Sequence, residues 1–180
     1  DEAGIKLSAN LTDSEGLVAR NSRNGTRDDT TLLISFAEPP RIEHYRPNGT
    51  HLGQLDIGVE LREELAHTGK NHDLEAVTEL PEFGVITTPK RPLKTAIGEN
   101  FWLFNLHGKI GGFQPLDEKY SELVGMESMQ NGDLLILERR YSSMFKPVIF
   151  ALRRVSLSTD ADDALKATVV EEVVHFDTSA

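Results

Sequence analysis

Residues 127–137 read Glu-Ser-Met-Gln-Asn-Gly-Asp-Leu-Leu-Ile-Leu, and this stretch predicts a β-hairpin. Asn131-Gly132 supplies the positive φ angles that a two-residue hairpin turn requires, and it is the strongest turn signal in the chain. The residues before it and the apolar run after it predict two paired strands. The same order of glutamate, short strand, turn and apolar strand occurs twice more, beginning at Glu15 and at Glu75.

These three stretches form an imperfect repeat whose glutamates lie roughly 50–60 residues apart. Repeats of about 40–50 residues built from short strands are typical of a β-propeller, in which each repeat is one four-stranded antiparallel blade. We therefore predict an all-β chain of three blades, at about 7–57, 71–117 and 121–176. A short helix at 59–68 is predicted between the first two blades, because apolar residues recur there at helical spacing.

Three blades cannot close a ring, since closed propellers usually have four to eight blades. The chain is therefore expected to be half of a six-bladed propeller whose other half is missing, or to pair with a second copy to make six blades. We favour the missing half, because natural repeat arrays need closure or capping.

Composition excludes several classes of protein. The 180 residues carry a formal net charge of -10, with 38% apolar and 27% charged residues, which is ordinary for a folded domain. An acidic chain without a basic cluster is a poor match for nucleic acid and a better one for metal cations. No apolar stretch is long enough to predict a membrane span. There is no cysteine, which excludes disulfides and thiol nucleophiles, and Asp1–Gly4 is not a signal peptide, so a processed or excised segment is expected.

The third repeat carries a resemblance to a known family. Residues 123–140 include Glu127, Asp133 and Leu134-Leu135-Ile136-Leu137-Glu138-Arg139, and they resemble the bacterial family called esterase-like activity of phytase, or the phytase-like domain. That family has glutamate-Gly-Leu, then Asp-Gly, then Leu-Leu-Leu-Glu-Arg in repeated blades.

The other repeats resemble further motifs of this family, at 13–17 with 33–38, and at 71–76. The second repeat departs from the pattern, because Pro89-Lys90 stands where the others end on a glutamate. The resemblance covers nearly the whole chain but only part of the family domain. It implies a periplasmic or secreted protein that hydrolyses a small-molecule ester or phosphate ester.

The repeated glutamates Glu15, Glu75 and Glu127 are the first candidate site. The first strand of a propeller blade lines the central channel, so three carboxylates would face a common axis. Calcium takes six to eight oxygen ligands, and an ion held there would polarise a bound phosphate. The alternative is that each glutamate accepts backbone hydrogen bonds from the neighbouring blade, as a clamp without chemistry.

The second candidate site consists of Glu38, Glu138 and Arg139, at matching strand ends. A glutamate beside an arginine fits a general base with an anion anchor, although salt bridges at strand ends are also common. The third is the loop from Lys90 and Arg91 to Lys94, which could attract an anionic substrate or be only a solvated loop.

His72, three residues before Glu75, is a further candidate for substrate binding, although a single loop histidine is more often structural. The histidines lack zinc-site spacing, and no Gly-x-Ser-x-Gly motif predicts a serine hydrolase. The leading hypothesis is a calcium-assisted hydrolase. The alternatives are a non-catalytic propeller that binds a small ligand or protein at its channel mouth, and a purely structural segment.

Overall fold

The computed structural model describes residues 12–26, 28–68, 73–95, 98–141, 143, 146–159 and 165–178. Within them the chain is all-β, with three antiparallel sheets and one short helix, α1 (Val59–Thr68), at the predicted place. No helix in these residues is long and apolar enough to cross a membrane.

The first and third sheets are four-stranded meanders, as predicted. The first sheet contains β1 (Ser14–Arg20), β2 (Thr31–Phe36), β3 (Arg41–Tyr45) and β4 (His51–Leu55). The third sheet contains β10 (Ser121–Ser128), β11 (Leu134–Arg140), β12 (Ile149–Thr159) and β13 (Leu165–Asp177).

The second sheet has one strand more than predicted. Its meander consists of β5 (Leu74–Leu80), β6 (Gly84–Pro89), β8 (Gly98–Asn105) and β9 (Gly108–Phe113). The additional strand is β7 (Leu93–Thr95), which pairs with the first residues of β8. The segment that we expected to be a basic loop up to Glu99 is therefore partly a strand.

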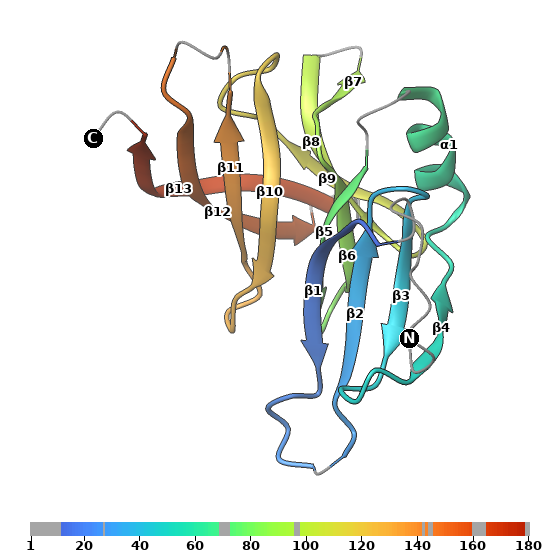
Figure 1. The fold of residues 1–180 in the computed structure, drawn as a ribbon. Helices are drawn as coiled ribbons and strands as arrows, with labels where there is room; N and C mark the ends of the chain where they lie inside the picture. The colour runs from blue at the N-terminus through green and yellow to red at the C-terminus, as the bar shows by residue number, and fades with distance from the viewer. Residues whose placement is uncertain are drawn as a thin grey trace.

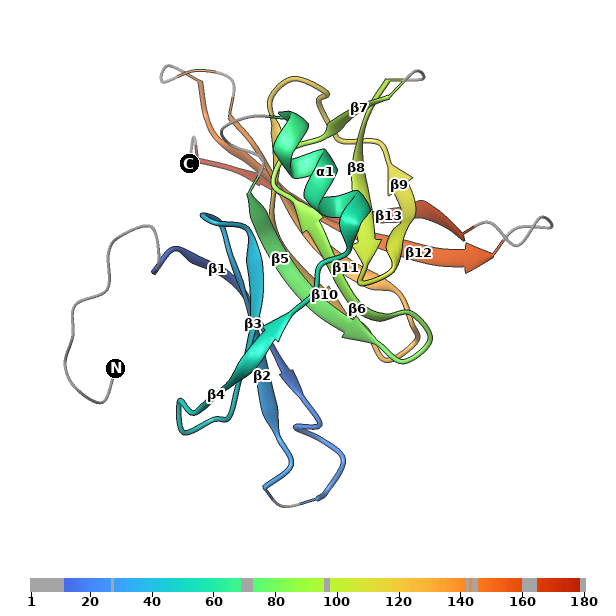
Figure 2. The same cartoon turned by 90° about the vertical axis from the view of Figure 1, so that its right-hand side faces the viewer.

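The three sheets fan out from their first strands. β5 contacts both β1 and β10, so these three strands lie side by side at the centre, as Figures 1 and 2 show, and β4 and β13 lie outermost. One hydrophobic core lies between the first and second sheets and includes Leu33, Ile42 and Val77. A second core lies between the second and third sheets and includes Ile86 and Leu134. Burial of each such side chain contributes about 1.5–3 kcal/mol.

A β-bulge at the start of each innermost strand fixes how the three repeats correspond. The register with the second strand shifts between Ser14 and Gly16, between Leu74 and Ala76, and between Leu123 and Gly125. Gly16, Ala76 and Gly125 are therefore equivalent. The residues that the bulges add are Glu15 and Glu75 in the first two repeats.

In the third repeat the added residue is Val124, not Glu127. The predicted correspondence of Glu127 with Glu15 and Glu75 is thus wrong by three residues. β10 begins four residues before the predicted strand, because Ser121 and Glu122 already pair with Arg140 and Arg139. The structural counterparts of Glu127 are the buried Val18 and Thr78.

Candidate functional site

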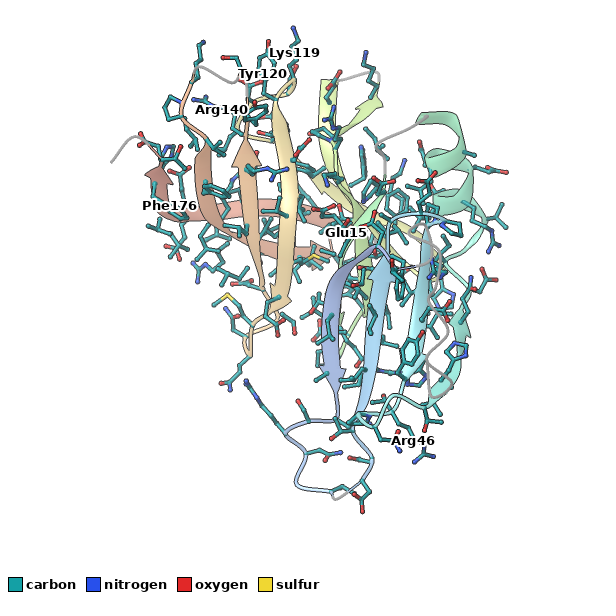
Figure 3. The ribbon with its side chains drawn as sticks, viewed as in Figure 1. Glu15, Arg46, Lys119, Tyr120, Arg140 and Phe176 are labelled. Carbon is teal, nitrogen blue, oxygen red and sulfur yellow. The ribbon has the colours of Figure 1, made fainter. Side chains whose placement is uncertain are left out.

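Charged side chains gather where the innermost strands begin and their partner strands end. We call Glu15, Glu75, Lys90, Arg91, Glu122 and Arg139 the charged cluster. Glu15 and Glu75 occupy the bulges of β1 and β5, and Lys90 follows the last residue of β6. Figure 3 shows Glu15 near the centre of the molecule, where the sheets meet. The cluster therefore draws residues from all three sheets.

Glu75 and Lys90 form a largely buried ion pair at the centre of this cluster. Lys90 Nζ lies 3.1 Å from Glu75 Oε2, and Glu75 is only 6% exposed. Burial raises the pKa of Glu75, and the negative charges of Glu15 and Glu122 add to the rise, although Lys90 opposes it. Burial would lower the pKa of Lys90, but the hydrogen bond and charge of Glu75, with the charges of Glu15 and Glu122, outweigh it and raise that pKa. Both groups hold protons more strongly than usual because carboxylates surround them.

Glu15 lies on the solvent-exposed side of the cluster. Partial burial of its carboxyl group raises its pKa, Lys90 acts against this, and the negative charges of Asp13 and Asp73 increase it. A carboxyl group with a raised pKa that solvent can reach is suited to transferring a proton.

Glu122 is held between two arginines. Arg91 donates a hydrogen bond to Glu122 Oε1 at 2.7 Å, and Arg139 donates one to Glu122 Oε2. Burial would raise the pKa of Glu122, but the hydrogen bonds and charges of Arg139 and Arg91 outweigh it and hold the pKa below its ordinary value. Glu122 is therefore an ionised anchor for the arginines, and Arg91, whose side chain is 46% exposed, keeps donors toward solvent.

Glu38, Glu138 and Arg139 lie in three different surroundings. Glu138 is fully buried, where its carboxylate accepts hydrogen bonds from Arg153 and from the backbone N–H of Leu116 at 2.7 Å. Glu38 is exposed in the turn after β2, whereas Arg139 belongs to the charged cluster. The structure therefore does not bring these three predicted residues together.

Glu127 lies apart from the other two predicted metal ligands. It is exposed near the opposite end of β10 from Glu122, and it lines a cleft of about 850 Å³. The walls of this cleft come from the ends of β1, β5 and β10 and from the turns that follow them, including Arg20, Phe83 and Met129. Among the residues that the structure describes, no group of three or more acidic or histidine side chains could hold a metal ion. His72 lies outside the described residues.

Comparison with known proteins gives one match. A model of the family described as esterase-like activity of phytase matches residues 1–178. The chain belongs to this phytase-like family. No curated protein sequence and no solved structure matches it. The resemblance inferred from the repeat motifs is thereby confirmed.

Two site features of this phytase-like chain escaped the sequence analysis. One is Glu122, the partner of Arg91 and Arg139, and the other is Arg153, the partner of Glu138. Alignment on an acid followed after two residues by Gly or Ala would have found Glu122, because residues 13–16, 73–76 and 122–125 share this order. No comparable sequence signal links Arg153 to Glu138, because that contact depends on the pairing of β11 with β12.

Proposed function

We propose that this chain is a three-bladed segment of a β-propeller that hydrolyses a small ester or phosphate ester, with the charged cluster as its active site. Membership of the phytase-like family supports hydrolysis at the level of the family. The single observation that carries the choice of site is the largely buried Glu75–Lys90 pair amid further carboxylates, where the innermost strands of all three sheets meet. Such a group of mutually perturbed titratable residues is characteristic of catalytic sites.

The cluster contains the groups that ester hydrolysis needs. A water molecule adds to the carbonyl carbon or the phosphorus, and the Glu15 carboxylate takes its proton as a general base. The protonated Glu15 then returns a proton to the leaving alkoxide, so that acid and alcohol are released. Arg91 and Lys90 stabilise the negative charge that develops on the ester oxygens, and Glu75 holds Lys90 in place.

Calcium assistance is the part of the proposal that needs its own test. Glu15 and Glu75 remain the predicted carboxylate ligands at the cluster, whereas Glu127 lies elsewhere. The midpoint of thermal unfolding should rise when calcium chloride replaces EDTA, and this rise should be lost in Glu75→Gln. An unchanged midpoint for the wild-type chain would remove calcium from the mechanism and leave hydrolysis by the side chains alone.

The activity test uses p-nitrophenyl phosphate and p-nitrophenyl acetate as generic substrates. We expect turnover of at least one of them, with a loss of about 100-fold or more in kcat/KM for Glu15→Gln and for Lys90→Met. Lys94→Met is the matched control, because the Lys94 side chain is 86% exposed and lies outside the cluster. Wild-type rates in both cluster variants would overturn the assignment of the site.

A non-catalytic function at the cleft is the second candidate. Its volume is within the usual range for small-ligand sites, and its lining mixes apolar side chains with polar turn residues. The fluorescence of anilinonaphthalene sulfonate should then increase on mixing, and Met129→Asp should weaken the increase. Val170→Asp, at an exposed position outside the cleft, is the control. Dye binding in the cleft together with no turnover of either ester would favour this function over hydrolysis.

A further inference from the structure

The two ends of the row of sheets present the two halves of an interface that the chain already uses twice. We call the side of a sheet that faces the following sheet its forward face, and the side that faces the preceding sheet its back face. The equivalence of Gly16, Ala76 and Gly125 fixes corresponding positions in the three sheets. Each face can therefore be compared position by position.

The forward faces of the first two sheets are completely covered. Leu33 of β2 and Ile86 of β6 are equivalent, and both are 0% exposed in the cores between sheets. Their counterpart in the third sheet, Leu135, is only half-buried. The next strand shows the same contrast, because Ile42 and Leu103 are 0% exposed and their counterpart Leu152 is half-buried.

The uncovered forward face of the third sheet is apolar across all of its outer strands. Side chains that share this face are Leu135, Leu137, Phe150, Leu152, Val174 and Phe176. The rings of Phe150 and Phe176 stack with centroids 5.2 Å apart, and Figure 3 shows Phe176 on the outer side of the third sheet. A sheet face that normally met water would carry mainly polar residues at these positions.

The back face of the first sheet lacks its cover in the same way. Val77 and Met126 occupy equivalent back-face positions and are 1% and 9% exposed, whereas their counterpart Leu17 is 58% exposed. Val85 and Leu134 are also buried, and their counterpart Leu32 is half-buried. The first sheet therefore presents the same kind of surface that the second and third sheets bury.

We propose that two copies of this chain pair about a two-fold axis and close a ring of six sheets. The forward face of the third sheet in each copy packs on the back face of the first sheet in the other. This contact repeats the geometry between the first and second sheets and between the second and third sheets. A second copy supplies both missing faces at once, so that no apolar sheet face stays exposed.

The test measures molar mass by light scattering after size exclusion. We expect about 40 kDa, twice the 20.0 kDa of one chain. Leu17→Glu on the back face and Leu135→Glu on the forward face should each shift the mass to 20 kDa. Val59→Glu is the matched control, because Val59 is 63% exposed on α1 and lies outside both faces. Thermal unfolding of each variant shows whether the monomer is still folded.

Mixing the two variants distinguishes this ring from other dimers. A pair made of one Leu17→Glu copy and one Leu135→Glu copy keeps one of its two interfaces intact, so the 40 kDa species should reappear. A dimer in which each face meets its own copy would not recover on mixing. A wild-type monomer, a dimer that resists both substitutions, or an open polymer larger than 40 kDa would each overturn the proposal. In the monomer case another β-sheet would have to cover these faces.

Discussion

The backbone N–H of Leu123 donates a hydrogen bond of 2.8 Å to the carbonyl oxygen of Lys90, which joins the third sheet to the second. The N–H of Lys90 in turn donates to the carbonyl oxygen of Asp73 at 2.9 Å. The main chain of Lys90 is thus fixed on both sides, and its side chain reaches Glu75 from a rigid base. Rigid support of this kind keeps charged groups in position for a reaction without a cost of reorganisation.

Replacement of Glu75 by Gln should change how stability depends on pH. The folded-state pKa of Glu75 is raised, so the stabilisation linked to its protonation is full below its ordinary pKa of 4.5 and is lost as pH rises through the raised value. Urea unfolding from pH 4 to pH 7 should show Glu75→Gln gaining stability relative to the wild type as pH increases. A constant difference across this range would contradict the raised pKa.

Replacement of Glu122 by Gln should have the opposite dependence. The folded-state pKa of Glu122 is lowered, so its contribution is full above the ordinary value of 4.5 and is lost as pH falls through the lowered value. Glu122→Gln should be less stable than the wild type at pH 7, and the difference should shrink toward pH 3. The same urea series measures it, and a penalty that grows in acid would refute the arginine anchor.

Gly16 is required for the close approach of β1 to β5. A Cβ atom at this position would lie 2.9 Å from the backbone nitrogen of Val77 and 3.0 Å from the Cα atom of Ala76. Gly16→Ala should therefore cost about 1–3 kcal/mol in the free energy of unfolding, as overpacking generally does.

Gly125→Ala provides the matched control for Gly16→Ala, because Gly125 occupies the equivalent position in the third repeat. Its added Cβ atom would meet only the Cβ atom of Leu137, at an ordinary 3.8 Å. We expect Gly125→Ala to be neutral or to stabilise by up to about 1 kcal/mol. Equal effects of the two substitutions would show that the approach of β1 to β5 is looser than the structure has it.

The ion pair of Glu138 with Arg153 should be structural and not catalytic. Glu138→Gln leaves the guanidinium group of Arg153 buried without its counter-ion, which should cost about 3–5 kcal/mol. The double variant Glu138→Leu with Arg153→Met removes both charges and should recover most of that loss. Urea unfolding measures both effects. A loss of hydrolysis in the folded double variant, at unchanged stability, would return Glu138 to the active site.

The class of fold was predictable from local signals. Apolar alternation, the Asn131-Gly132 turn and the spaced repeats predicted an all-β chain with antiparallel meanders and a helix at 59–68, and the structure confirms these features. The strand β7 was missed, because three residues flanked by Pro92 carry little periodicity.

The candidate site was predictable only in part. Glu75, Lys90 and Arg91 were identified from the sequence as separate candidates, and the structure places them in one cluster. Glu127 was aligned by the similarity of its neighbours, but a bulge adds one residue to a strand without a fixed sequence signature. Similarity of neighbours therefore could not reveal the register.

The sequence by itself determined the local structure, the repeat and the family, because turn chemistry and hydrophobic periodicity act over a few neighbouring residues. Only the tertiary structure decided which charges meet. Glu122 meets Arg91, and Glu138 meets Arg153, through pairing and packing between distant segments. Burial then set the direction of the pKa shifts, because the energy of a charge depends on all the groups that displace water around it.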